Sequence, residues 1–84
     1  MPICVICGKE YSLSEGTLAD EGFICDKDER RVVNLVVEIA GEILLNKKTI
    51  EEAMAKYKGK IQGIGLSEED IRARVIRYAL KFIR

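Results

Sequence analysis

The chain has 84 residues, of which 48% are hydrophobic and 33% charged, a balance that excludes a disordered segment and predicts one small domain over residues 1–84. No apolar run approaches the roughly 20 residues of a membrane-spanning helix, so we expect no membrane partner. The formal net charge is zero, but residues 1–46 carry four bases and nine acids, whereas residues 47–84 carry ten bases and five acids. The halves therefore either pair with each other or leave the second half for an anionic partner.

Near the start of the chain, Cys4 and Cys7 form a Cys-x2-Cys pair, and Cys25 and Asp28 form a Cys-x2-Asp pair. Two residues between ligands let one tight turn direct both side chains at the same point, so two such turns can enclose a zinc ion tetrahedrally. Asp is an acceptable oxygen ligand, and the chain has no histidine to compete for the fourth position. The spacing predicts a zinc site within residues 1–28, formed by Cys4, Cys7, Cys25 and Asp28.

Other interpretations of these residues stay open at this point. Asp28 also suits the role of a helix-capping acid, since acids stabilise the first turn of a helix. Cys4 and Cys7 could be a redox dithiol, although such pairs usually open a helix after a strand, and a four-thiolate iron site would need a fourth cysteine. The fourth ligand could instead be a water, which would leave an open position, or another carboxylate: Asp20, Glu21 or Asp26.

The first 25 residues carry the glycines expected of knuckles and hairpins. Gly8 follows Cys7 directly, which suits a metal knuckle because turning backbone amides towards the sulfurs often requires a positive φ. Residues 17–19 and 22–24 flank Asp20 and Glu21, and this pattern predicts a two-stranded ribbon that returns Cys25 to the first pair.

A long apolar helix is predicted from Asp26 to Leu45. Asp26 is a candidate N-cap, with Glu29 three residues later in a capping-box arrangement. Apolar residues surround most of the helix axis and leave a narrow polar edge: Asn34, Glu38, Gly41 and Glu42. A helix that is apolar on nearly every side must be covered on nearly every side. This predicts a homodimer, and the alternative is a central helix wrapped by its own chain.

Two shorter helices follow, which gives a small α+β fold with about three helices in residues 29–84. Thr49 and Glu52 form a capping box for a helix over residues 50–58. Ser67 caps the last helix, whose acidic first turn and basic last turn both suit the helix dipole. The segment between these helices is expected to be irregular because it contains three glycines: Gly59, Gly63 and Gly65.

The order of motifs resembles that of a treble-clef zinc finger over residues 3–46. A knuckle closed by glycine (Cys4-Val5-Ile6-Cys7-Gly8) is followed by a hairpin and by a second pair at the start of a helix (Cys25-Asp26-Lys27-Asp28). The resemblance implies that Cys4, Cys7 and Cys25 are thiolate zinc ligands, and it puts Asp28 where most members have Cys or His. This superfamily has very many functions, so the resemblance implies no particular activity.

The predicted metal is structural, and we expect that the protein is not an enzyme. Three thiolates and one carboxylate give zinc a net negative site, which is a poor Lewis acid. The chain also lacks histidine and has no phosphate-binding glycine loop followed by Lys-Ser or Lys-Thr.

The last helix carries four bases at steps of three and four residues, which places them in one stripe: Arg74, Arg77, Lys81 and Arg84. Aligned cations displace counterions from phosphates, so the stripe predicts nucleic-acid binding. One alternative is a solvated face that keeps the protein soluble. The other is a protein-interaction module that assembles as a homodimer through the apolar first helix.

The N-terminal sequence Met-Pro-Ile-Cys shows no basic leader and no cleavage site, so we expect a cytoplasmic protein. In that reducing compartment a Cys-x2-Cys pair binds metal more often than it forms a disulfide. The composition is rich in Lys, Glu, Arg and Ile and contains one Gln and no Trp, which favours a heat-adapted source.

Overall fold

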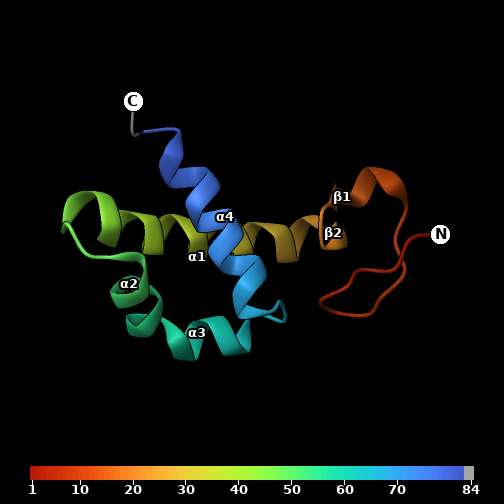
Figure 1. Cartoon of the computed structure of the whole chain (residues 1–84). Helices are drawn as coiled ribbons and strands as arrows, with labels where there is room; N and C mark the ends of the chain where they lie inside the picture. The colour runs from red at the N-terminus through yellow and green to blue at the C-terminus, as the bar shows by residue number, and fades with distance from the viewer. Residues whose placement is uncertain (83–84) are drawn as a thin grey trace.

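The computed structural model describes residues 1–82 and confirms a small α+β fold, with a hairpin followed by helices (Figure 1). A 3-10 turn (Leu13–Glu15) leads into strands β1 (Gly16–Ala19) and β2 (Gly22–Cys25), which pair antiparallel as predicted. The helices within these residues are α1 (Asp26–Leu45), α2 (Ile50–Lys56), α3 (Lys58–Gly63) and α4 (Glu68–Leu80). Helix α4 crosses α1, while α2 and α3 lie beneath α1 in the view of Figure 1.

The start of α1 differs from the prediction. Cys25 is the N-cap, with the extended backbone dihedrals φ −67° and ψ 155°, so Asp26 is already the first helical residue. The predicted capping box of Asp26 and Glu29 is therefore wrong. The Glu29 carboxylate instead reaches across to α4, where it accepts hydrogen bonds from Arg74.

The segment after α2 also differs, because the chain returns to a helix where it was expected to be irregular. Tyr57 separates α2 from α3, and α3 then continues through Gly59 to Gly63, so four helices form in residues 1–82 instead of about three. Glycine costs about 1 kcal/mol relative to alanine in a helix. Burial of Ile61, which is 3% exposed, offsets this cost because a buried aliphatic side chain contributes about 1.5–3 kcal/mol.

Two predicted helix starts are confirmed in detail. The Thr49 side chain accepts a hydrogen bond from the backbone N–H of Glu52, and the Glu52 carboxylate accepts one from the Thr49 N–H, which completes the capping box of α2. The Ser67 hydroxyl accepts from the Asp70 N–H at 3.1 Å and caps α4. Both capping motifs involve residues three positions apart in the sequence, so they could be predicted without knowledge of any tertiary contact.

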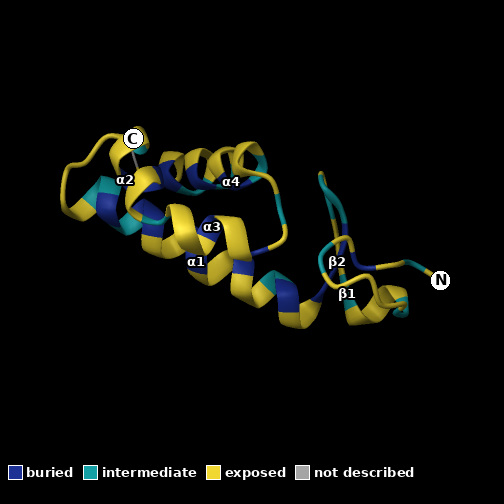
Figure 2. Ribbon diagram, turned by 90° about the horizontal axis from the view of Figure 1, so that it is seen from below, coloured by how far each residue is buried: buried dark blue, intermediate teal, exposed yellow. Residues whose placement is uncertain are grey.

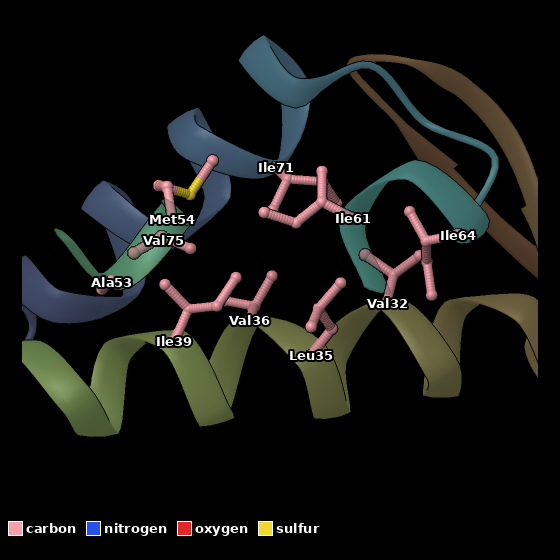
Figure 3. Close-up of a cluster of buried hydrophobic side chains, with 10 residues drawn as sticks. All are labelled: Val32, Leu35, Val36, Ile39, Ala53, Met54, Ile61, Ile64, Ile71 and Val75. Atoms are coloured by element: carbon pink, nitrogen blue, oxygen red, sulfur yellow. The ribbon is translucent and has the colours of Figure 1, made fainter. Parts of the chain in front are cut away.

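The main hydrophobic core lies on one side of α1 (Figure 3). Ten buried side chains form it, and they come from all four helices and the segment after α3: Val32, Leu35, Val36, Ile39, Ala53, Met54, Ile61, Ile64, Ile71 and Val75. A second, smaller cluster beside the hairpin consists of Cys4, Phe23, Ile24 and Cys25. Ile6 and Leu66 pack against both clusters and so connect the hairpin to the helices.

The other side of α1 is not covered by its own chain. Figure 2 shows α4 on one side of α1 and no element of residues 1–82 on the opposite side. Even beside α4, apolar side chains of α1 stay exposed: Val37 is 41% exposed, and so is Val33, which borders a groove with Arg77 and Tyr78 of α4. The alternative of a central helix wrapped by its own chain therefore does not hold for the described residues, and the homodimer stays a prediction.

Ion pairs join the acidic first half of the chain to the basic second half. The most buried involves Arg74, whose side chain is 12% exposed and whose guanidinium donates to both Glu21 at the hairpin tip and Glu29 on α1, each at 3.1 Å. Arg77 pairs with Asp20 at 3.1 Å on the surface. Lys56 and Lys60 likewise pair with two acids of α1, Glu42 and Glu38. The structure thus favours pairing of the two halves with each other.

We predict that Arg74→Met destabilises the protein by about 3–5 kcal/mol, because it leaves the Glu21 carboxylate, whose side chain is 5% exposed, buried without its cation. The matched control is Arg72→Met on the same helix, whose partner Glu51 is 68% exposed, and we expect a loss of about 1 kcal/mol or less. Urea unfolding of both variants measures these losses. Equal losses would contradict a special role for Arg74.

We predict that Glu42 contributes to stability at neutral pH and not in acid. Its hydrogen bonds with Lys56 and then Asn46 hold the pKa of the Glu42 carboxyl below its ordinary value. A carboxyl with a lowered folded pKa stabilises the protein above its unfolded pKa of about 4.3, and this contribution is lost as the pH falls through the folded pKa.

Glu42→Gln should therefore be less stable than the wild type at pH 7, and the gap should close as the pH is lowered below about 4. The quantity compared is the difference between the unfolding free energies of the two proteins at each pH. Contributions from groups that titrate in both proteins therefore cancel. In a Lys56→Met background the gap at pH 7 should shrink. A gap that stays constant from neutral to acidic pH would rule out this linkage.

Candidate metal centre

The structure brings the four predicted ligands together where the hairpin meets α1. Cys4 and Cys7 belong to a turn in which the Gly8 N–H donates to the Cys4 carbonyl at 2.9 Å, and Gly8 has the positive φ of 75° expected for a knuckle. Cys25 ends β2, and Asp28 lies in the first turn of α1. One ligand atom from each of the four residues lies within 4.8 Å of the others, so the group could hold a metal ion.

Two of the distances between ligand atoms match the edges of a tetrahedral metal site. Asp28 Oδ2 lies 3.4 Å from Cys4 Sγ and 3.3 Å from Cys25 Sγ. Zinc bonds of about 2.3 Å to sulfur and about 2.0 Å to oxygen give a tetrahedron whose sulfur–oxygen edges are about 3.5 Å. The other carboxylate oxygen, Oδ1, accepts a hydrogen bond from Arg31 at 3.3 Å, so the two oxygens face different partners.

The other carboxylates considered for the fourth position lie elsewhere. Asp20 pairs with Arg77, and Glu21 pairs with Arg74 at the hairpin tip. Asp26 is exposed and does not belong to the cluster, although it is the neighbour of Cys25. Asp28 is buried, and its Oδ2 faces two sulfurs, which a role as a helix cap alone does not explain. The geometry therefore favours Asp28 as the fourth ligand.

Burial and hydrogen bonding change the acidity of the groups in the cluster. Burial raises the pKa of the Cys25 thiol, whereas the Tyr11 hydroxyl is the main cause of a lowered pKa at the exposed Cys7. Burial by itself would raise the pKa of Asp28, but hydrogen bonds from the cysteines and from Arg31 outweigh it, so the Asp28 pKa is below its ordinary value. The carboxylate is thus ionised at neutral pH, as a metal ligand must be.

Two residues beside the cluster were not singled out from the sequence. Tyr11 Oη lies 3.4 Å from Cys7 Sγ, and hydrogen bonding with Cys7 and Cys25 raises the pKa of Tyr11, which keeps its hydroxyl protonated. Arg31 holds Asp28 Oδ1. The i, i+3 spacing of Asp28 and Arg31 on a helix is a signal that would have found the arginine. Tyr11 lies in an irregular segment, where spacing alone predicts no contact.

The knuckle does not have the setting of a redox dithiol. Reactive Cys-x2-Cys pairs usually lie at a helix N-terminus, whose dipole lowers the pKa of one thiol. Here the residues that follow Cys7 lead through an isolated bridge and a 3-10 turn into β1, and the first long helix begins only at Asp26. The described structure thus favours the metal interpretation of Cys4 and Cys7 over the redox one.

The predicted basic stripe on α4 is largely engaged in ion pairs. Arg74 is held by two glutamates, and Arg77 by Asp20. Lys81 is exposed at the end of the helix, and Arg84 lies outside the described residues. Nucleic-acid binding therefore stays a prediction without support from this surface, because a guanidinium already bound to carboxylates is a poor phosphate ligand.

Comparison of the chain with protein-family models, with curated proteins and with solved structures finds no match. Among residues 1–82, no helix combines the length and the apolar content that crossing a membrane requires. The function of the protein is therefore inferred from the geometry of the cysteine and aspartate cluster.

We predict that Tyr11→Phe weakens metal binding about 10–100-fold, because hydrogen bonds to metal ligands contribute this much to affinity. Competition against a chelator of known affinity measures the change. The matched control is Tyr78→Phe, which removes the same atom from a half-buried tyrosine on α4. Equal affinities of the two variants would show that the Tyr11 hydroxyl does not support the site.

Proposed function

We propose that the protein is a small, non-enzymatic interaction module whose N-terminal unit is stabilised by a structural zinc ion. The observation that carries this proposal is the convergence of three cysteine sulfurs and one Asp28 oxygen within 4.8 Å. Thiolates and a carboxylate are ligands that zinc accepts, and their number fills a tetrahedron. The order of knuckle, hairpin and helix supports a treble-clef arrangement of this unit.

A structural role fits the donor set better than a catalytic one. Catalytic zinc sites usually have three protein ligands and an open position for water, whereas this cluster supplies four donors. Three thiolates and one carboxylate also outweigh the charge of zinc, so a bound water would keep a high pKa. The residues would hold the metal in place and supply no chemistry beyond binding.

The ligands come from three separate elements, so a metal would join them. Cys4 and Cys7 come from the knuckle, Cys25 from the end of β2 and Asp28 from α1. The hydrophobic cluster beside them has only four buried members, whereas the helical core has ten. The N-terminal unit therefore depends on the metal more than the helices do, since small domains with little core need such additional links.

The binding function is proposed to be protein interaction, with nucleic-acid binding as the weaker candidate. Val33 and Val37, which are exposed and four residues apart on α1, support a protein partner, since neighbouring exposed apolar side chains are typical of interaction sites. The ion pairs of Arg74 and Arg77 weigh against a phosphate partner at α4.

We predict that purified protein contains one zinc ion per chain and that Asp28→Ala loses most of it. The matched control is Asp26→Ala, which removes an acid from the same helical turn and so has a similar effect on the helix dipole, but takes no ligand from the cluster. Metal analysis by mass spectrometry and thermal melting measure the result. Chelation should lower the melting temperature and disorder the first 25 residues before the helical core.

A full zinc equivalent in Asp28→Ala would move the fourth ligand elsewhere. A chelated wild-type protein that kept its spectrum and melting temperature would rule out the structural zinc altogether. Asp28→Cys provides a third measurement, since a fourth thiolate at this position should keep or strengthen zinc binding.

A further inference from the structure

The two strands of the hairpin are covered very differently. All of β2 after Gly22 is buried, whereas Thr17 and Leu18, which are neighbours in β1, are both exposed. Successive side chains of a strand point to opposite faces, so β1 is uncovered on both of its faces. Leu18 is a large apolar residue and is 73% exposed. Strand β1 is therefore the bare edge of the sheet.

The backbone of β1 has unused hydrogen-bonding groups on this edge. Leu18 pairs with Phe23, whose carbonyl points away from β1 and accepts a hydrogen bond from the Val5 N–H at 2.9 Å. The two residues of such an antiparallel pair both direct their backbone groups away from each other, so the N–H and C=O of Leu18 point to the open edge. Within residues 1–82, neither group forms a hydrogen bond there. An open edge of this kind can pair with a further strand.

A groove of about 420 Å³ begins at this strand and lies between the hairpin, α1 and α4. Its hairpin wall comes from β1 and the turn, and β2 takes no part in it. The apolar lining comes from all three elements: Leu18, Ala19, Val33, Val36 and Tyr78. Ligand-binding clefts have volumes of about 300–1,000 Å³. The open edge of β1 and an apolar groove thus adjoin each other at Leu18.

One positive charge of this groove has no opposite charge beside it. Arg74 and Arg77 line the groove, but carboxylates of the chain already bind both of them. Lys81 lines the groove one turn further along α4, is exposed, and forms no ion pair within residues 1–82. An acidic group of a partner would be complementary to this charge.

We propose that β1 and the groove bind an extended segment of another protein, in which apolar and polar residues alternate and an acid lies at one end. The segment adds a strand to the hairpin through the N–H and C=O of Leu18. Its apolar side chains enter the groove beside Val33 and Tyr78, while its acid pairs with Lys81. In strand addition the main chain supplies affinity and alternate side chains supply specificity. This inference rests on the proposed interaction function and names the kind of partner.

The test uses two capped peptides of the same composition and opposite direction, Glu-Thr-Leu-Thr-Val-Thr and Thr-Val-Thr-Leu-Thr-Glu. The two directions correspond to antiparallel and parallel addition to β1, which place the acid at the same end of the groove. Fluorescence anisotropy of labelled peptides with the zinc-loaded full chain measures affinity. One of the two should bind with a dissociation constant of about 100 µM or lower, as expected of a small interface. If neither binds at about 1 mM, the proposal is wrong.

N-methylated peptides distinguish an added strand from a ligand that only fills the groove. In an added strand, alternate N–H groups point to β1. Methylation of the leucine nitrogen or of a neighbouring threonine nitrogen should therefore weaken binding unequally, with a loss of about tenfold or more at one of them. Hydrogen exchange of the Leu18 amide should also slow when the peptide binds. Equal effects of the two methyl groups, or unchanged exchange at Leu18, would overturn strand addition.

Val33→Glu tests the groove, and Val37→Glu is its matched control. Both valines lie on α1 and are 41% exposed, but only Val33 lines the groove. Val33→Glu should weaken peptide binding about tenfold or more, because a carboxylate there would lie against the apolar residues of the peptide. Val37→Glu should leave the affinity unchanged. Equal effects of the two variants would assign the peptide to another surface.

Charge reversal at Lys81 tests recognition of the acid. Lys81→Glu should weaken binding about threefold to tenfold, because it brings two like charges together. Peptides that carry Lys in place of Glu should bind this variant better than they bind the wild type. The matched control is Lys58→Glu, which changes the net charge equally at an exposed position outside the groove. An effect of Lys81→Glu no larger than that of Lys58→Glu would contradict the proposed acid.

Zinc analysis of the same samples separates this proposal from the metal centre, and circular dichroism checks that each variant is folded. Zinc-loaded protein that binds neither peptide overturns the strand site and leaves the metal centre standing. Peptide binding by a protein that takes up no zinc would support the strand site and contradict the metal centre.

Discussion

Strand β2 passes into α1 without a linker, and the rest of the structure depends on this junction. Cys25 is both the last residue of the strand and the N-cap of the helix. The hairpin therefore has a fixed direction relative to α1, which places Asp28 opposite the sulfurs of Cys4 and Cys25. The same junction brings Glu21 and Glu29 to the same guanidinium, that of Arg74.

The hairpin unit and the helices are stabilised by different interactions. The helices share a core of ten buried side chains, whereas the hairpin has a small cluster, the candidate metal site and the ion pairs of Arg74. Burying charges is costly, and this arrangement is tolerated because each carboxylate oxygen of Glu21 and Glu29 has a nitrogen of Arg74 at 3.1 Å. Ile6 and Leu66 contact both clusters and so join the hairpin to the helices. Gly65 permits this contact, because a Cβ there would lie 2.8 Å from Ile6.

The opposite charges of the two halves of the chain serve mainly to join the elements. Acids on the hairpin and α1 pair with bases on α2, α3 and α4, and these pairs surround the core. The layers are thus held by charges at their edges and by apolar packing between them.

The sequence by itself determined the features that depend on near neighbours. The spacing of the cysteines and Asp28, the turn between the strands and the caps at Thr49 and Ser67 are all local, so their geometry follows from short stretches of backbone. Only the tertiary structure decided that Arg74 pairs with carboxylates from two distant elements, that a helix forms through Gly59 and that Tyr11 reaches Cys7. These outcomes depend on contacts between residues that are far apart in the sequence. The free energy of such contacts exceeds the local conformational preferences, and only the local preferences can be inferred from the sequence.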